Sequence, residues 1–368
     1  MSDIIVSLAN EEQLQACYRL AYQVFCLEMG TMRENADHER GILCDEAILR
    51  SKVLCAEVDG EVVGTLAMLI GTSDRFPEHF EHGFEIERFV PVVPRDRMSI
   101  MIRFLVKPEY RGSAVPMKLI AESAKYQFQL GLQLLFCDCQ PHLVNLYESV
   151  GFRPYAPVFE QAGFGIMVPL VFVVPDVAHL RSIRSPIIRY SKGIDDPVLT
   201  VSIVKLLPDN APVTSMGDLE RAAWMEAVGF LGQPRQNTGA FEGFSEEEMT
   251  AFLNRSQVLE CADGHQIVVK GQGTRSAYVI LEGAVDVRSN GALVARLGAG
   301  EMFGEFALLL DTKRTADVFA KGERVRLVVL DERNLQKLLA SHAELAAKFL
   351  LNLSRSLAVR LLNQSAAR

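Results

Sequence analysis

The sequence of 368 residues lacks the features that mark secreted, membrane-spanning or metal-binding proteins. Its seven cysteines are odd in number and none is spaced as CxxC, which argues against a disulfide framework and against a metal site. The first residues contain no basic segment followed by an apolar core, so no signal peptide is expected. The most apolar stretch, 163–175, is too short to cross a bilayer and contains prolines. We therefore expect a cytoplasmic protein with reduced thiols and no membrane span.

Basic residues are also too dispersed to suggest a nucleic-acid partner. The 38 lysines and arginines form no long run, and the net charge is −8. No internal repeat or low-complexity tract is visible. Apolar residues make up 49% of the chain, which is ample for real cores, and the length suggests two or three domains.

The first part of the sequence alternates strand-like and helix-like patterns. This order predicts an α/β domain over 1–175, in which helices flank a mixed sheet. The expected helices cover 11–29, 110–131 and 141–152; the expected strands cover 53–70 (a hairpin around Asp59 and Gly60), 84–93, 97–108 and 132–140.

The residue pattern of the remaining chain changes twice, at about 176 and at about 241. Residues 176–240 carry many turn and breaker residues, so we expect a partly ordered connector, with a strand over 198–207 and a helix over 219–230. From 241 to 368, short strands separated by turns predict an all-β jelly roll or small barrel. A long amphipathic helix is expected over 341–364 at its end.

Within this last region, Glu305 and Arg314 stand nine residues apart around an apolar run. A short helix beginning at Gly304 would offer unpaired backbone N–H groups to an anion. Arg314 would add a charged, bidentate partner for a phosphate, and Glu305 could accept a hydrogen bond from a sugar hydroxyl. Such a pocket fits a cyclic nucleotide. The alternative is a barrel in which Glu305 and Arg314 form an ordinary surface pair.

Residues 241–362 resemble the cyclic nucleotide-binding domain. The matching features are Gly264, Gly271, Tyr278, Gly283, Gly300, the segment FGEFALLL (303–310), KRTADV (313–318) and LVVLD (327–331). The resemblance implies that Glu305 holds the ribose 2′-hydroxyl and that Arg314 holds the cyclic phosphate. The expected nucleotide-binding residues are Phe303, Gly304, Glu305, Phe306, Ala307, Arg314, Thr315 and Ala316. We expect cAMP, although Thr315 also suits cGMP. Since one helix ends the sequence, we expect no DNA-reading module and an effector that lies upstream.

In the first region, residues 106–120 read as a strand, a tight turn and the start of a helix, a topology that holds phosphate on backbone amides. Together with NLYESVGF (145–152), this segment resembles the GNAT N-acyltransferase superfamily. The resemblance implies that the turn binds the phosphates of an acyl donor and that Tyr147 protonates the departing thiolate, although Tyr147 could also be a packing residue. The expected donor-binding residues are Val106, Arg111, Gly112, Ser113, Ala114 and Asn145.

A narrower resemblance covers about 18–170. The segments YRLAYQVFCLEMG (18–30), the acidic pair at 45–46, VVGTLAML (62–69) and FEIERF (84–89) look like the branch of acyl-homoserine-lactone synthases and N-acyl amino acid synthases. This resemblance implies substrate-binding roles for Arg19, Phe25 and Arg88 and an acidic role for Glu85.

The turn departs from the superfamily pattern Arg-x-x-Gly-x-Gly. Arg111 leads instead to Ala114 and Pro116; proline has no N–H, and alanine restricts close backbone approach. A weaker pyrophosphate cradle suits an acyl carrier protein, whose pantetheine arm has one phosphate. It is also compatible with an inactive fold.

The chemistry of amide formation assigns the remaining roles. An amine must lose its proton before it attacks a thioester, so a carboxylate is needed near it. Glu85 and Glu87 are the candidates because, at i and i+2 on the expected strand, they would share a face; the alternative is an acidic edge paired with Arg88. A backbone N–H near Val106 would meet the oxyanion. Arg103 either binds an acceptor carboxylate or forms a surface salt bridge.

These inferences combine into one reading. We expect an enzyme that moves an acyl group from acyl carrier protein or CoA to a small amine, such as an amino acid, under activation by a cyclic nucleotide. The alternatives are a non-catalytic nucleotide sensor with an acyl-binding domain and a cAMP-regulated protein lysine acetyltransferase. The last helix could close over the nucleotide or form a homodimer.

Overall fold

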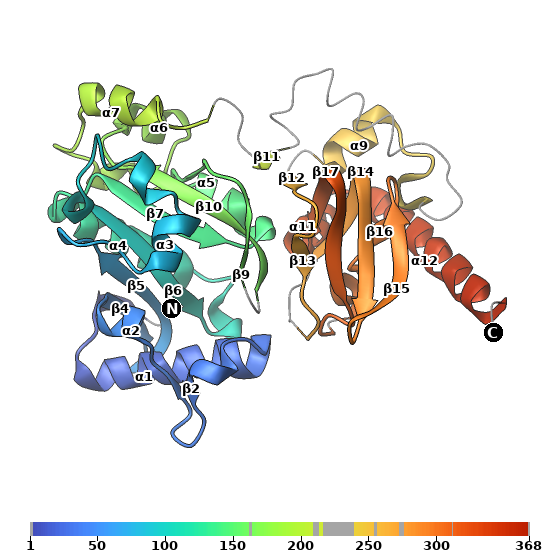
Figure 1. Cartoon of the computed structure of the whole chain (residues 1–368), viewed down its shortest axis with the longest axis horizontal. Coiled ribbons are helices and arrows are strands. Elements are labelled where there is room, and N and C mark those ends of the chain that lie inside the picture. Colours follow the sequence, from blue (N-terminus) through green and yellow to red (C-terminus); the bar gives the residue numbers. More distant parts are fainter. Residues whose placement is uncertain are drawn as a thin grey trace. The chain divides into compact units, whose positions relative to one another are not determined.

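The computed structural model describes residues 3–161, 164–208, 213–215, 239–253, 256–271, 276–310 and 312–366. The chain forms two compact units (Figure 1). The first consists of 1–139, 146–157 and 168–211, and the second of 140–145, 158–167 and 212–368. The expected helix over 219–230 lies outside the described residues.

One sheet, most of which lies in the first unit, has the order β1-β4-β5-β6-β7-β10-β8, with β9 paired to β10. Neighbouring strands are antiparallel except β6 and β7, which are parallel, so the expected mixed sheet is confirmed. The strands are β1 (Ile4–Leu8), β4 (Lys52–Val58), β5 (Glu61–Ile70), β6 (Met98–Val106), β7 (Leu134–Cys139), β8 (Arg153–Pro154), β9 (Phe159–Gln161) and β10 (Gly165–Val173), with a separate pair β2 (Ala36–Asp37) and β3 (Ile42–Leu43). The expected hairpin is the turn between β4 and β5, where Asp59 and Gly60 both have positive φ.

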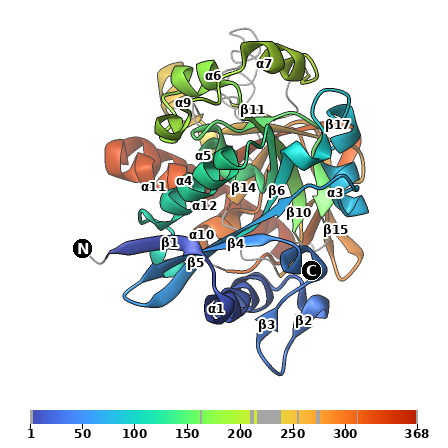
Figure 2. The same ribbon diagram turned by 90° about the vertical axis from the view of Figure 1, so that its left-hand side faces the viewer.

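Helices α1 (Glu11–Ala21) and α4 (Val115–Gln129) cover opposite faces of this sheet (Figure 2). Cys17 of α1 is hydrogen-bonded to Thr65 of β5. Gly64, the residue before Thr65, faces Leu119 of α4. Successive residues of a strand point to opposite faces, so the two helices enclose β5. The remaining helical segments are η1 (Tyr22–Met29, a π-helix), η2 (Arg33–Asn35), α2 (Glu46–Leu49), α3 (Glu78–Gly83), η3 (Ile86–Arg88), η4 (Arg95–Arg97), η5 (Pro108–Tyr110), η6 (Pro141–Leu143), α5 (Val144–Glu148), α6 (Val177–Ser182), η7 (Ile188–Tyr190) and α7 (Pro197–Val204).

The expected strand over 84–93 is wrong. Phe84 ends α3, Glu85 has φ of 44°, and η3 follows as a single tight turn. Phe84 and Ile86 alternate like a strand, but Ile86, Phe89 and Val93 are spaced like successive helical turns, and all are buried. Glu85 and Glu87 therefore do not share a strand face.

The expected strand over 198–207 is wrong as well. This segment is α7, which begins at Pro197 after Asp196, whose side chain accepts a hydrogen bond from the N–H of Leu199. Proline at the first helical position and an aspartate cap start a helix more strongly than the β-branched residues favour a strand. Ile203 is buried in the core of the first unit, so this part of the expected connector packs with that unit.

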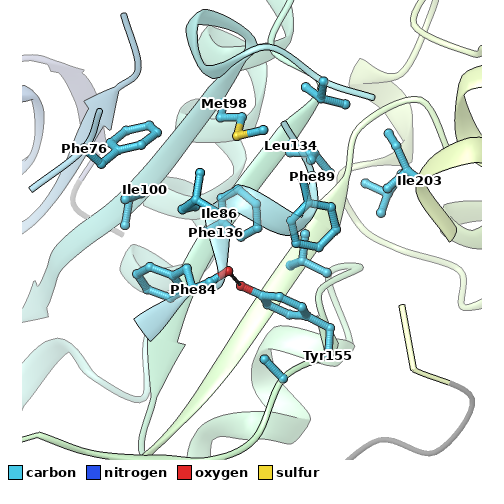
Figure 3. Packing of buried hydrophobic residues seen from close by; sticks show 14 of the residues in the cluster. Phe76, Phe84, Ile86, Phe89, Met98, Ile100, Leu134, Phe136, Tyr155 and Ile203 are labelled. Carbon is cyan, nitrogen blue, oxygen red and sulfur yellow. Dashed lines mark hydrogen bonds between the residues drawn. The ribbon is translucent and has the colours of Figure 1, made fainter. Parts of the chain in front are cut away.

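That core is an aromatic cluster between the sheet and the segment 76–93 (Figure 3). Phe136 of β7 lies near Phe84, Phe89 and Tyr155, with ring centroids 5.4–6.0 Å from its own. The hydroxyl of Tyr155 donates to the carbonyl of Phe84 at 2.6 Å. This hydrogen bond and the packed rings fix the segment 84–89 against the sheet.

The second unit is a β-sandwich, as expected. Its sheet has the order β11-β12-β17-β14-β15, with β13 on β17 and β16 on β14. The strands are β11 (Val213–Ser215), β12 (Gln257–Cys261), β13 (Gln266–Val268), β14 (Ser276–Ser289), β15 (Ala292–Gly298), β16 (Met302–Phe303) and β17 (Asp317–Asp331). The helical segments are η9 (Gly239–Phe241), α9 (Glu246–Leu253), α10 (Glu305–Leu310), α11 (Glu332–Ser341) and α12 (Ala343–Ala366). The predicted terminal helix is confirmed as α12, whose Leu345, Phe349 and Leu353 are buried.

Across the described residues, no helix combines the length and the apolarity that crossing a membrane requires.

Phe136→Ala tests the aromatic cluster. Because this ring is fully buried among three others, we expect its truncation to lower the free energy of unfolding of the first unit by about 3–5 kcal/mol. Leu130→Ala, at a position that is 43% exposed, is the matched control and should change it by less than about 0.5 kcal/mol. Urea titration followed by circular dichroism measures both. Equal midpoints for the two variants would contradict the role given to this cluster.

Candidate functional sites

The central feature of the first unit is the place where β6 and β7 part. They pair only from Met98 with Leu134 to Ile100 with Phe136. Beyond this point β6 continues to Val106 while paired with β5, and β7 continues to Cys139 while paired with β10. The facing edges of both strands therefore offer backbone groups that the sheet does not use.

The N–H of Val106 is one of these groups. The next residue, Lys107, donates its N–H to Val63 of β5 at 2.9 Å. Successive N–H groups of a strand point to opposite sides, so the N–H of Val106 points away from β5, toward the parting. The carbonyl of Val106 points the same way, since it accepts from Nε of Arg111 at 3.0 Å. The N–H of Val106, which the sequence suggested as an oxyanion donor, thus points into the space between the parted strands.

A bulge in β6 turns Arg103 toward the amino-terminal segments. Its φ is 53°, and the β5–β6 register shifts between Thr65 and Ala67. Arg103 forms an ion pair with Asp45, and its guanidinium carbon lies 5.3 Å from the ring centre of Phe25. The side chains of Arg103 and Asp45 are only 15% and 20% exposed, so this is a largely buried pair rather than a surface salt bridge. The structure thus brings together two residues that the sequence nominated, Phe25 and Arg103.

The π-helix η1 links this group to the turn after β6. It carries the buried Phe25 and, one turn later, Glu28. Both carboxylate oxygens of Glu28 accept from Arg111, each at 2.6 Å. π-helical turns recur at functional sites because they displace side chains from helical register. Arg111, expected to bind the donor, is thereby held in a bidentate pair.

The turn itself uses many of its own N–H groups. Those of Arg111, Ser113 and Lys118 donate to backbone carbonyls, and that of Val115 donates to the hydroxyl of Ser113 at 3.1 Å. Pro116 has no N–H to give. Gly112 is open, with no atom within 4 Å of the position that a Cβ would occupy. The turn can therefore give a phosphate fewer donors than a turn built from glycines.

Tyr147 of α5 is buried beside the rings of Phe104 and Phe152, at 6.5 and 5.6 Å between centroids. Burial raises the pKa of Tyr147 well above its usual value, so the phenol keeps its proton at neutral pH. Tyr147 is thus a packing residue whose phenol is protonated at neutral pH. Asn145 precedes it on the same helix.

The residues of the FEIERF segment separate into two groups. Arg88 pairs with Glu85 and donates to the carbonyl of Tyr155 at 3.2 Å. Glu87 lies instead against Arg75 and Arg95, at 2.6 and 2.8 Å. The structure does not bring the two glutamates together.

Two further residues complete the comparison with the sequence predictions. Arg19 is exposed on α1. Asp138, which sequence reasoning passed over, lies on β7 beyond the parting, and burial raises its pKa to about 6 against the opposing effect of Arg103. A carboxylate inside the otherwise apolar strand LLFCDC was the signal that could have found it.

In the second unit, Glu305 and Arg314 are each only 4% exposed, so they are not a surface pair. Arg314 donates to the carbonyl of Gly304 and to the hydroxyl of Ser276, both at 3.0 Å. Its guanidinium carbon lies 5.9 Å from the ring centre of Tyr278. Burial lowers the pKa of Arg314, with Tyr278 and Glu305 opposing, but an arginine starts from so high a pKa that it stays charged.

Gly304 has to be a glycine. Its φ is 81°, and a Cβ would lie 2.6 Å from Nη1 of Arg314 and 2.9 Å from the carbonyl of Ser276. The next residue, Glu305, begins α10, as predicted for a helix that starts at this point. Gly304 thus brings the start of α10 next to the guanidinium of Arg314.

The other expected nucleotide-binding residues surround this centre. Phe303 stacks on Tyr278 at 5.0 Å, Ala307 is buried, Phe306 is 44% exposed, Thr315 is exposed and Ala316 is half-buried. Ser276 is a member that sequence reasoning missed, because a single serine before a strand gives no pattern.

Comparison with known proteins gives a match for each unit. The family model described as N-acyl amino acid synthase FeeM matches residues 16–173, and that of the cyclic nucleotide-binding domain matches residues 258–342. The solved structure of the acyl-homoserine-lactone synthase LasI has a TM-score of 0.38 and 16% identity, covering 47% of this chain and 91% of LasI.

Two curated relatives from Drosophila melanogaster match the second unit. The cAMP-dependent protein kinase type II regulatory subunit is 36% identical over 81 residues, which are 21% of this chain and 22% of that protein. The cGMP-dependent protein kinase, isozyme 1, is 31% identical over 96 residues, which are 24% of this chain and 12% of that protein. The chain thus spans less than a quarter of the length of either relative. The chain thus contains, over residues 16–173, an N-acyltransferase domain that matches the N-acyl amino acid synthase FeeM family model and, over residues 258–342, a match to the cyclic nucleotide-binding domain.

Proposed function

We propose that this protein transfers an acyl group from a thioester to the amine of a small acceptor, an amino acid or a similar compound, and that a cyclic nucleotide regulates the transfer. The observation that carries the proposal is the parting of β6 and β7, which leaves the N–H of Val106 directed away from β5, on the same strand that carries Arg103 and its ion pair with Asp45. A thioester carbonyl at that N–H would be polarised for attack.

The acceptor class follows from the charges beside the parting. A free amino acid carries a carboxylate and an ammonium group, and Arg103 and Asp45 present the two opposite charges side by side. Phe25 closes one side of the guanidinium with an apolar ring. A guanidinium has five N–H donors, so Arg103 can donate to a substrate carboxylate while it keeps its ion pair with Asp45. These contacts favour a zwitterion over a protein lysine, whose carboxyl group is tied up in a peptide bond.

The donor side supports a carrier-linked thioester more than free CoA. The turn after β6 has few N–H groups left for a pyrophosphate, and Pro116 removes another. Acyl carrier protein brings a single phosphate on its pantetheine arm, which needs fewer N–H donors from this turn than a pyrophosphate does. Tyr147, protonated at neutral pH, can give its proton to the departing thiolate.

For the second unit, the proposal is that cAMP, or cGMP, binds with its phosphate at Arg314 and the start of α10 and with its ribose at Glu305. Leu308, on the inner side of α10, belongs to one apolar cluster with Phe349 and Leu353 of α12. A ligand whose phosphate moves α10 would therefore also change the packing of α12. We expect this to activate acyl transfer.

The expected site of the reaction is the cytoplasm. All seven cysteines are thiols rather than disulfides, which suits a reducing compartment.

A reconstituted assay tests the whole proposal. The protein is incubated with long-chain acyl carrier protein or acyl-CoA and a mixture of amino acids, with and without cAMP, and the products are identified by mass spectrometry. We expect an N-acyl amino acid, formed faster from the carrier protein and about 5–150-fold faster with nucleotide, the range of typical couplings. Turnover confined to acetyl-CoA and protein lysines would replace this proposal with protein acetylation, and nucleotide binding without any rate change would remove the regulatory part.

Arg314→Ala should weaken nucleotide binding. It removes a buried, charge-assisted contact worth about 1.5–3 kcal/mol, so we expect the Kd for cAMP to rise roughly 10–100-fold. Arg324→Ala is the matched control, because that arginine forms an exposed pair with Glu260 in the same unit. Calorimetry of both variants decides: an unchanged Kd in Arg314→Ala would show that the phosphate binds elsewhere.

Tyr147→Phe should slow the departure of a poor leaving group. With an alkyl thioester, whose thiolate needs a proton, we expect kcat to fall about 100-fold, the lower end for general acid catalysis. With an aryl thioester, whose thiolate is stable without a proton, most of this loss should disappear. A loss of the same size for both donors would assign Tyr147 to packing alone.

A further inference from the structure

We propose that Asp138 is the residue that accepts the proton from the acceptor amine. The inference rests on the proposed function and names a catalytic group within it. It replaces the glutamates Glu85 and Glu87, which the sequence suggested for this role.

The position of Asp138 follows from the strand register. The last residue of β7 paired with β6 is Phe136, so Asp138 lies two residues beyond the parting. On its other side, β7 remains paired with β10, where Asp138 lies opposite Pro169. Its side chain points to the same face as Phe136, because they are two residues apart on one strand. This puts a carboxylate beside the unpaired stretch of β6 that ends at Val106.

Among the described residues, both charged and neutral ionisable groups act on Asp138 or lie near it. Arg103 faces it from β6 and favours its ionised form. The charge of Asp138 also acts on the phenols of Tyr147, on α5, and of Tyr155, in the segment after β8. Burial raises the pKa of both phenols well above the usual value, so they are neutral at physiological pH.

Arg103 itself also interacts with Asp45 and with His79, whose pKa burial lowers, so that this imidazole is neutral at physiological pH. The strand neighbours of Asp138, Cys137 and Cys139, have pKa values raised well above the usual range by burial, so they are neutral thiols. Glu148 acts on Cys139, and the pair of Glu85 and Arg88 acts on Tyr155 with opposite signs.

This environment suits a base. Burial raises the pKa of Asp138 from 3.8 to about 6, so the group is ionised at pH 7 and holds a proton more firmly than an ordinary aspartate. A carboxylate with a pKa nearer the operating pH is the better proton acceptor. Perturbed carboxylates of this kind gather at catalytic sites more than elsewhere.

The two glutamates are less suited to the role. Glu87 contacts two arginines, Arg75 and Arg95, so its protonation would cost two ion pairs. Glu85 is paired with Arg88, whose guanidinium also holds the backbone of Tyr155. The strand β6 itself, MSIMIRFLV, contains no carboxylate. Asp138 lies on β7 beyond the parting and, within the described residues, forms no ion pair of the kind that holds Glu85, Glu87 and Asp45.

Amide formation removes two protons from the acceptor nitrogen and supplies one to the departing sulfur. The acceptor ammonium gives one proton to the carboxylate of Asp138, and the neutral nitrogen attacks the thioester carbonyl carbon. The C–N bond forms and the C–S bond breaks, while Tyr147 gives its proton to the thiolate. The nitrogen passes its second proton through water to the phenolate of Tyr147, and Asp138 later releases its proton to water. No oxidant, reductant or metal is needed.

Asp138→Asn tests the assignment through two nucleophiles. With an amino acid acceptor, which must be deprotonated, we expect kcat/KM to fall about 10²–10⁴-fold. With hydroxylamine, which is already neutral at pH 7.5, the loss should be less than about tenfold, because no base is needed. Asp138→Glu should recover part of the amino acid activity. Asp96→Asn, an exposed change of the same charge, is the control and should leave both rates unchanged.

The pH profile supplies an independent readout. For the wild type, kcat/KM with an amino acid should fall below an apparent pKa near 6, and this acid limb should be absent from Asp138→Asn. Circular dichroism establishes that the variant is folded. Equal rates for Asp138→Asn and wild type, or the same loss with both nucleophiles, would overturn the inference. If wild-type protein acylates neither nucleophile from any thioester, the proposed function fails, and Asp138 loses its role with it.

Discussion

The chemistry proposed for this protein depends on one interruption of a hydrogen-bond ladder. A parallel pair of central strands normally satisfies all the backbone groups between them, yet β6 and β7 share only three residue pairs before they part. The outer neighbours β5 and β10 hold both strands in the sheet beyond this point, so the parted edges stay in place instead of collapsing. A rigid scaffold with unused polar groups at its centre is a favourable place for catalysis, because the donors are already oriented before substrate arrives.

The side chains at the parting are arranged around the same constraint. Arg103 lies on a bulge whose positive φ costs energy for a residue with a Cβ, and the ion pair with Asp45 requires both charges to be desolvated. Asp138 carries a related cost, because burial disfavours its ionised form. Above the pKa of Asp138, the folded protein is therefore less stable than it would be with a neutral residue at this position. The stability needed to hold these groups comes from apolar contacts elsewhere, such as those of the cluster around Phe136.

Much of this architecture could be predicted from the sequence, and the failures have physical causes. The hairpin at Asp59 and Gly60 and the start of α10 after Gly304 follow from local rules, because left-handed backbone and helix starts need particular residues. The segment 84–93 failed because its apolar residues fit both a strand and a series of tight turns, and tertiary packing chose the turns. Asp138 was missed for a different reason. Its importance comes from the place where two strands separate, and strand register is a long-range property that a single sequence does not display.

The second unit shows how a buried charge can prepare a ligand site. Arg314 has lost most of its hydration and is held by the carbonyl of Gly304 and the hydroxyl of Ser276, so its orientation is set before any anion arrives. A phosphate that reaches it gains a fixed charge in a poorly hydrated setting, where electrostatic attraction is stronger than in water. Binding alone regulates nothing, since a ligand shifts an equilibrium only through a difference in affinity between two states. Under the proposed function, that difference would come from α10, whose first turn would meet the ligand, because Leu308 on this helix packs in one cluster with Phe349 of α12. A small movement of α10 would then change the packing of α12, and phosphate binding would in this way change the shape of the unit.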